Sequence, residues 1–99
     1  MYGTVARMKV LPGKEAEFEA QGKQYEDLNI PGFIASATYK ADAGDNEYWL
    51  AVVFESRELY RANADDPAQD ERFRKMAALL AAEPEWHDGD VIGRQVAGG

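Results

Sequence analysis

The sequence contains no cysteine. Disulfide bonds, thiolate nucleophiles and cysteine-ligated metal sites are therefore excluded. Serine is also scarce: only Ser36 and Ser56 occur, and neither lies in the Gly-x-Ser-x-Gly setting of a nucleophilic serine. The chain has no glycine-rich phosphate-binding loop, so a nucleotide cofactor is not indicated.

Positive charge is limited too. The chain has 11 basic and 18 acidic residues and a formal net charge of −7. An acidic chain has no electrostatic reason to bind phosphate backbones or anionic lipid, so neither nucleic acid nor a membrane is a predicted partner. No apolar run approaches the roughly 20 residues of a membrane span, and residues 1–10 lack the pattern of a signal peptide. We therefore expect a cytoplasmic protein.

The length of 99 residues suits one domain over residues 1–99, with residues 97–99 as a loose tail. A domain of this size buries only about 60–65% of the surface that its unfolded chain exposes. The predicted core is therefore modest, and a dimer interface would add to it.

Residues 47–55 are apolar on both faces if they form a strand. One face would carry Tyr48, Leu50, Val52 and Phe54, and the other Trp49, Ala51 and Val53. A strand with one solvated face shows polar residues there. One layer of helices can cover only one face, so we expect the chain's own helices on the Tyr48 face. A second copy of the chain, or a ligand, is expected on the Trp49 face.

Alternation and turn residues predict the order of elements. Strands are expected over residues 2–11, 33–41, 47–55 and 85–96, and helices over 14–29, 57–64 and 67–82. Turn-forming residues at 42–46 join the second and third strands as a hairpin. Ser56 and Asp66 are predicted N-caps. Taking the two short helices after the hairpin as one unit, this is the split βαβ, ferredoxin-like order of an α+β fold: a four-stranded antiparallel sheet with helices on one face.

The first predicted helix has a thin apolar stripe in which Phe18, Gly22, Tyr25 and Asn29 recur at helical spacing. A glycine inside a helix costs about 1 kcal/mol relative to alanine. Close approach of the helix to the sheet at Gly22 would explain it. We expect the helix to stop before residue 30, because Pro31 disfavours the helical conformation there.

Three short motifs occur in a fixed order along the sequence. They are Pro12-Gly13-Lys14 before the helix carrying Phe18, Pro31-Gly32-Phe33 at the second strand, and residues 54–63 followed by Asp66-Pro67 and Phe73. Their order over residues 2–93 resembles the antibiotic biosynthesis monooxygenase (ABM) family of the dimeric α/β-barrel superfamily. The resemblance implies a ferredoxin-like protomer that forms a homodimer through its sheet face.

Members of this family include cofactor-free monooxygenases of polycyclic phenols or quinols, haem-degrading enzymes and proteins without assigned activity. The resemblance implies a monooxygenase acting on a planar aromatic substrate without metal or flavin. A non-catalytic dimeric barrel that binds a small apolar ligand is the alternative, and an isomerase-like relative is a third. The family often has His where this chain has Asn63, which weighs against a His-dependent mechanism. The haem-degrading branch uses an Asn on the first strand and a Trp and a His on helices, and these are missing here.

Aromatic residues are abundant for this length: Trp49, Trp86, Tyr25, Tyr39, Tyr60 and Phe73. Such side chains line small-molecule pockets, but they also fill cores and interfaces. The candidate substrate-binding residues are Trp49, Trp86, Tyr60 and Phe73, and the candidate catalytic residues are His87, Asn63 and Tyr60. Tyr60 and Asn63 lie one helical step apart and could jointly bind a phenolic ligand, although Asn63 could equally be solvent-exposed.

His87 is the only histidine and could act as a base near neutral pH, or be an ordinary histidine at the start of a strand. On a strand, Asp88 and Asp90 share a face from which His87 points away, so no metal site is predicted there. The turn acids near residues 42–47 lack the spacing of a calcium loop. Arg7 could stabilise a phenolate or superoxide-like anion, but more often such an arginine pairs with a carboxylate, here Glu47 or Glu55.

Overall fold

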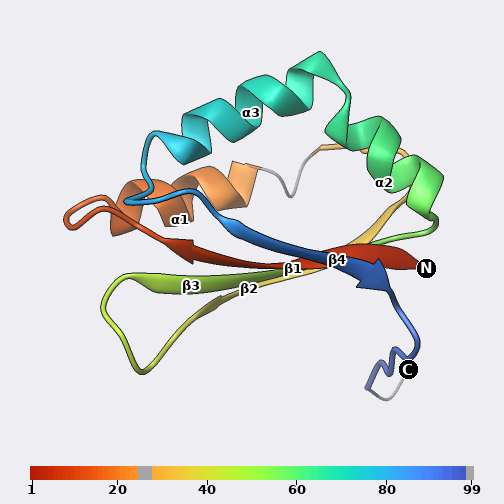
Figure 1. Ribbon diagram of the computed structural model, residues 1–99, viewed down its shortest axis with the longest axis horizontal. Coiled ribbons are helices and arrows are strands. Elements are labelled where there is room, and N and C mark those ends of the chain that lie inside the picture. Colours follow the sequence, from red (N-terminus) through yellow and green to blue (C-terminus); the bar gives the residue numbers. More distant parts are fainter. Residues whose placement is uncertain (25–27, 98–99) are drawn as a thin grey trace.

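The computed structural model describes residues 1–24 and 28–97. Within them lie β1 (Tyr2–Lys9), α1 (Glu15–Lys23), β2 (Phe33–Lys40), β3 (Glu47–Phe54), α2 (Arg57–Ala64), α3 (Pro67–Ala77) and β4 (Glu85–Asp90). The strands form one antiparallel sheet in the order β2-β3-β1-β4. Figure 1 shows the helices together on one side of this sheet. The predicted ferredoxin-like α+β fold is confirmed.

Local signals in the sequence set several of the element boundaries. The Ser56 hydroxyl accepts a hydrogen bond of 3.2 Å from the Leu59 N–H, and an Asp66 carboxylate oxygen accepts one of 2.8 Å from the Ala68 N–H. These bonds satisfy N–H groups that a helix start leaves unpaired. Both predicted N-caps are therefore confirmed.

At the start of β2, Gly32 has a φ of 81°, a left-handed conformation that favours glycine.

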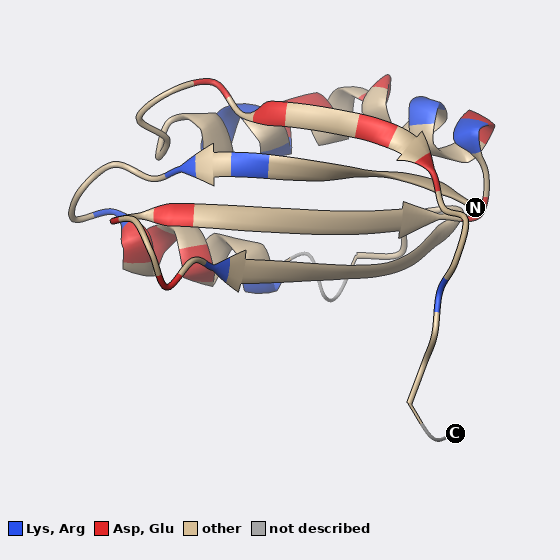
Figure 2. Cartoon of the chain, turned by 60° about the horizontal axis from the view of Figure 1, so that its bottom comes forward, with Lys and Arg blue, Asp and Glu red and all other residues tan. Residues whose placement is uncertain are grey.

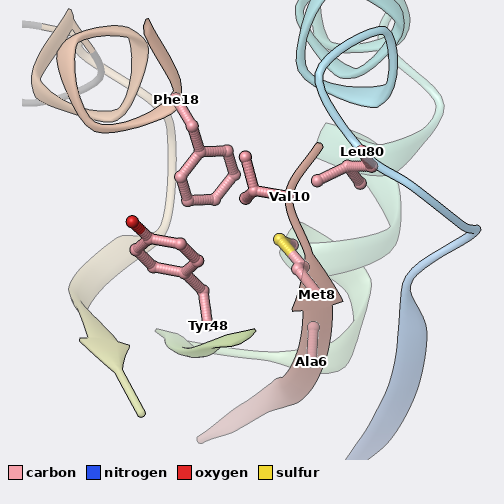
Figure 3. Close-up of a cluster of buried hydrophobic side chains, with 6 residues drawn as sticks. All are labelled: Ala6, Met8, Val10, Phe18, Tyr48 and Leu80. Atoms are coloured by element: carbon pink, nitrogen blue, oxygen red, sulfur yellow. The ribbon is translucent and has the colours of Figure 1, made fainter. Parts of the chain in front are cut away.

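The core lies between β1, β3 and the helices. In register, Met8 of β1 lies opposite Tyr48 of β3, on the face that the helices cover. Figure 3 shows the buried cluster formed by Ala6, Met8, Val10, Phe18, Tyr48 and Leu80. The Phe18 and Tyr48 rings are 4.8 Å apart, and the Tyr48 hydroxyl donates a 2.7 Å hydrogen bond to Glu19. The prediction that the Tyr48 face of this strand meets the chain's own helices is confirmed.

A second cluster of aromatic rings fixes α2 on the sheet. The Tyr60 ring of α2 lies 5.3 Å from the Tyr2 ring and 5.6 Å from the Phe54 ring. Phe54 in turn meets Phe33 edge to face at 5.8 Å. Tilted and edge-to-face pairs at these distances are favourable arrangements for aromatic rings. The cluster holds the Tyr60 hydroxyl in one place above β1 and β4.

The face of the sheet turned away from the helices, the open face, carries Val5, Ala35, Ala37, Tyr39, Trp49, Ala51 and Val53. Figure 2 shows that charged residues on the two central strands lie toward one end. Val5 is 46% exposed, Trp49 36% and Tyr39 63%. The helices leave this apolar surface uncovered.

Arg7 lies on the open face between two carboxylates. Its guanidinium pairs with Glu47 of β3 and, at 2.9 Å, with Glu85 of β4. These contacts raise the pKa of Arg7, the hydrogen bond to Glu47 contributing most. The predicted pairing with Glu47 is confirmed, whereas Glu85 takes the place of the other candidate, Glu55.

Several predicted elements are longer than the observed ones. β4 ends at Asp90 rather than residue 96, because its partner β1 begins at Tyr2 and pairs no further. Only the Val91 N–H continues the contact, donating a 2.9 Å hydrogen bond to the Met1 carbonyl. α3 ends at Ala77 rather than residue 82, because the chain turns there to bring Leu80 into a β-bridge with Val10.

The first predicted helix also ends early. α1 stops at Lys23, and residues 28–29 are not helical. Tyr25 and the end of the predicted tail, residues 98–99, lie outside the described residues. A Cβ added at Gly22 would meet none of the described residues within 4 Å, so close approach of the helix to the sheet is the wrong explanation for this glycine. β1 stops two residues before the predicted end of that strand, and β2 and β3 each stop one residue early.

None of the helices described has both the length and the apolar character needed to cross a membrane.

Candidate functional site

A cleft of about 430 Å³ opens between α3, the turn that follows it, and β4. Its lining residues are mostly apolar and include Phe73, Ala77, Leu80, Pro84 and Trp86, together with Glu83. Binding sites for small molecules are typically concave, have volumes of about 300–1,000 Å³ and are lined mainly by apolar and aromatic side chains. The volume of this cleft falls within that range, and most of its lining residues are apolar.

Two aromatic side chains form one wall of this cleft. The rings of Phe73 and Trp86 are 6.0 Å apart and inclined by 45°. Trp86 is 42% exposed, so a large part of its indole surface is free for contact with a ligand. Its cross-strand neighbour on β1 is Ala6, whose small side chain is fully buried. The structure thus brings together two of the predicted substrate-binding residues, Phe73 and Trp86.

A polar group lies beside the aromatic wall. Asp88 follows Trp86 by two residues on β4, so both side chains point to the helix side of the sheet. The Tyr60 hydroxyl of α2 donates a 2.9 Å hydrogen bond to Asp88 Oδ1. Burial, and then the hydrogen bond to Asp88, raises the pKa of Tyr60 to about 12, while the interaction of the Thr4 hydroxyl with the Tyr60 hydroxyl lowers it. The Tyr60 hydroxyl is thus the donor to Asp88.

Thr4 of β1 lies opposite Asp88 in the β1–β4 register. It is only 5% exposed, and its Oγ1 is shielded from solvent near the Tyr60 hydroxyl, whose pKa it lowers.

Asn63 lies one turn after Tyr60 on α2 and is half-buried, so full solvent exposure of this residue is ruled out. Its backbone carbonyl accepts a hydrogen bond from the Asp66 N–H. Leu59, Tyr60 and Asn63 are the α2 residues that turn toward the sheet, as their helical spacing predicts.

The predicted site residues divide between the two faces of the sheet. Tyr60, Phe73, Trp86 and Asn63 lie on the helix side, whereas Trp49 and His87 lie on the open face. His87 is opposite Val5 in the register, and Trp49 is opposite Arg7. Within one protomer, therefore, neither Trp49 nor His87 can share a cleft with Trp86.

Sequence reasoning did not select Thr4 or Asp88 for the site. The alternation of Trp86 and Asp88 along one strand was a usable signal for Asp88. Thr4 could not be found in this way, because its place beside Asp88 depends on the β1–β4 register. In residues 1–24 and 28–97, no three His, Asp or Glu side chains come together in a way that could hold a metal ion.

The sequence matches the family model described as antibiotic biosynthesis monooxygenase over residues 1–77. Three similar solved structures are an asparagine-to-alanine variant of SnoaB and candidate antibiotic biosynthesis monooxygenases from Chloroflexus aurantiacus J-10-fl and Bordetella bronchiseptica. SnoaB is a cofactor-independent oxygenase from Streptomyces nogalater. No curated protein matches the sequence.

These structures agree with the present fold over almost their whole length. The SnoaB variant has a TM-score of 0.81 and 20% identity, with 94% of each chain covered. The Chloroflexus protein has a TM-score of 0.79 and 22% identity, with 98% of each chain covered. The Bordetella protein has a TM-score of 0.79 and 24% identity, covering 92% of this chain and 96% of its own. At such identities the likeness shows the fold alone.

Proposed function

Since the chain belongs to the antibiotic biosynthesis monooxygenase family, we propose that it is a monooxygenase that oxidises a planar hydroxylated aromatic compound with O₂ and without a bound cofactor. The observation that carries this proposal is the cleft walled by Phe73 and Trp86, with the Tyr60–Asp88 pair two residues beyond Trp86 along β4. An aromatic wall binds a flat ring by stacking, and a few polar groups orient its substituents.

The reaction balances without an external reductant. One atom of O₂ becomes a carbonyl oxygen on a ring carbon of the phenol, and the other leaves as water. The two hydrogens of that water are the phenolic hydrogen and the hydrogen of the attacked carbon. The four electrons that O₂ takes up all come from the substrate, whose phenolate form is the electron donor.

The protein's part in this reaction is to bind the ring, exclude water and stabilise the phenolate. Phe73 and Trp86 would hold the ring in the apolar cleft. The Asn63 amide is a neutral hydrogen-bond donor on the same side of the sheet. Donors that are fixed before the reaction, in a site shielded from water, stabilise a developing oxyanion more strongly than water does.

Oxygen uptake tests the proposal. The full chain is mixed with mono-, bi- and tricyclic phenols and hydroquinones in an oxygen electrode, with boiled protein as the control for autoxidation. The expected result is protein-dependent uptake for a planar polycyclic substrate, with one atom of ¹⁸O₂ in the product and one in water. Measurable binding without uptake across the whole panel would overturn the monooxygenase proposal.

That outcome would support the second candidate, a non-catalytic protein that binds a small apolar ligand. The observation that favours this candidate is the position of His87, the only histidine in the sequence, which lies on the open face and not at the cleft. Without a histidine at the cleft, the usual proton-transfer group for neutral pH is missing from that site.

We further propose that a second copy of the chain covers the open face. The protomer exposes 6952 Å², whereas a compact monomer of its mass, 11.0 kDa, exposes about 5600 Å². The excess exceeds the roughly 800 Å² that each partner buries in a standard interface. Residues 91–97 leave the sheet on the side away from the helices (Figure 1) and carry exposed Ile92 and Val96. The uncovered apolar surface of the protomer therefore lies on the side of the sheet away from the helices.

A further inference from the structure

Residues 91–97, here called the arm, follow β4 and are not part of the sheet. The Val91 N–H donates a 2.9 Å hydrogen bond to the Met1 carbonyl. From Ile92 onward, no group of the arm forms a hydrogen bond or an ion pair within residues 1–24 and 28–97. The arm is therefore held to the rest of its own protomer only at its first residue.

The arm has apolar side chains that lie fully in solvent. Ile92 is 101% exposed and Val96 is 69% exposed. In an extended segment, residues separated by an even number of positions share a face, so Ile92 and Val96 would lie on one side and Gln95 on the other. Isoleucine and valine favour strands, because their branched side chains pack well on a pleated surface. The arm thus has the side chains of a strand without a neighbouring strand.

The arm points into the space that a second copy would occupy. Figure 1 shows it leaving the sheet on the side opposite the helices, and Figure 2 shows it extending beyond the ends of the strands. Seven extended residues span about 23 Å, whereas two packed sheets lie about 10 Å apart. The arm is therefore long enough to cross the interface with its first residues and to run along a strand of the second copy with the rest.

β2 is the edge strand that is better suited to receive the arm. β2 and β4 are the two edges of the sheet. Natural edge strands are commonly protected from pairing by charged side chains, proline or bulges. β4 carries three acidic side chains in six residues. Residues 35–39 of β2 have no charge and no proline, and the one bulge in the pairing of β2 with β3 lies before them.

The helices also leave this edge uncovered. Ser36, Ala37, Thr38 and Tyr39 are all exposed, although successive side chains of a strand point to opposite faces. An edge strand of this kind presents a row of unpaired N–H and C=O groups to an extended segment. When such a segment adds to a sheet, main-chain hydrogen bonds give affinity and alternate side chains give specificity.

We propose that the arm of each chain crosses to the second copy and pairs as an added strand with the edge of its β2. The proposal rests on the second copy that is proposed to cover the open face. Since a two-fold dimer uses the same surfaces on both chains, two arms bind two β2 edges at once. Ile92 and Val96 then lie beside the open-face side chains of that strand, Ala37 and Tyr39, and their apolar surface leaves water.

The first test measures the strength of the dimer. Ile92→Asp places a charge on the packed side of the arm, and we expect the dimer Kd, measured by sedimentation of a dilution series, to rise about 100-fold, about 10-fold for each of the two arms. Gln95→Asp adds the same charge on the other side of the arm and should leave the Kd within about threefold of the wild type. Ile92 is fully exposed in the protomer, so its substitution should leave the circular dichroism spectrum unchanged.

The second test locates the arm on the second copy. Because the sequence has no cysteine, Gln95→Cys can carry a single nitroxide label. The labelled chain is refolded together with ¹⁵N-labelled wild type, so that only amide signals of the other chain are observed. The signals of residues 35–39 should lose the most intensity and those of β4 the least, with a diamagnetic label as the control. A strongest loss at β4, or no loss in a dimer, would overturn the proposal.

These outcomes separate the arm from the proposals on which it rests. A dimer whose Kd is insensitive to Ile92→Asp would remove the arm and keep the second copy. A wild-type chain that sediments at 11.0 kDa would remove both. Neither measurement uses turnover, so the oxygenase proposal stands or falls separately by oxygen uptake.

Discussion

Trp86 and His87 are adjacent in the sequence, yet their side chains lie on opposite faces of the sheet. Trp86 packs against Phe73 of α3 at 6.0 Å, whereas His87 lies opposite Val5 on the open face. The cause is the alternation of side chains along a strand. One residue is therefore placed to contact a ligand in the cleft, and the other is placed to contact whatever covers the open face.

This relationship predicts that substitutions at two neighbouring positions affect ligand binding differently. Trp86→Ala should weaken the binding of a bicyclic phenol about 10-fold, because it removes a stacking surface worth about 1 kcal/mol or more. His87→Ala should leave the affinity within twofold of the wild type. Isothermal titration calorimetry measures both, and Trp86→Phe, which keeps a ring, should recover part of the loss. An equal loss in His87→Ala would place His87 at the cleft and contradict the arrangement.

A second prediction concerns Gly22, which lies inside α1 and whose added Cβ would meet no atom of residues 1–24 and 28–97 within 4 Å. Gly22→Ala should raise the free energy of unfolding by about 0.5–1 kcal/mol, because alanine is the better helix former and fills only open space. Urea denaturation measures the change. A lower unfolding midpoint would contradict this prediction, because it would mean that alanine is less favourable than glycine at this position of the helix.

Gly3 provides the matched control, because the same substitution there meets backbone. A Cβ at Gly3 would lie 1.8 Å from the Val52 carbonyl oxygen of the neighbouring strand. Gly3→Ala must therefore displace β1 from β3, and we expect a loss of at least about 2 kcal/mol or a failure to fold. An unfolding midpoint equal to that of the wild type would contradict the close approach of these two strands.

Much of the fold could be predicted because its signals are local. The apolar alternation around Tyr48 and Trp49, and the caps at Ser56 and Asp66, depend only on neighbouring residues, and the structure contains all of them. The end of β4 depends instead on where its partner β1 begins. The candidate site has the same limitation: Tyr60 reaches Asp88 across 28 residues of sequence, through a helix placement that no local pattern contains.

Stability at high pH is a further prediction. Burial, followed by the hydrogen bond to Glu19, raises the pKa of Tyr48 from 10.0 to about 12, and Tyr60 is raised to about 12 by burial and Asp88. The folded state thus holds these two protons more tightly than the unfolded state. Their contribution to the free energy of unfolding is complete below pH 10 and is lost as the pH rises toward 12. Urea midpoints measured from pH 8 to 11.5 should fall above pH 10. The fall should be less steep in Tyr48→Phe, and an identical slope in that variant would contradict the assignment.

The last prediction concerns the open face. Trp49 is 36% exposed there, between Arg7 of β1 and Tyr39 of β2 in the register. Sedimentation equilibrium at micromolar concentration should give twice the 11.0 kDa mass of one chain. Trp49→Glu should reduce it to the mass of one chain, because it would bury a carboxylate between two apolar sheets beside Arg7, whose guanidinium is already paired with Glu47 and Glu85.

The control for this experiment is Ala62→Glu, which adds the same charge at an exposed position on α2. It should leave the mass unchanged. A wild-type chain that sediments at 11.0 kDa would show that the open face is solvated in solution. The apolar side chains of β1, β2 and β3 would then require another partner, since an antiparallel sheet with a solvated face normally has polar residues there.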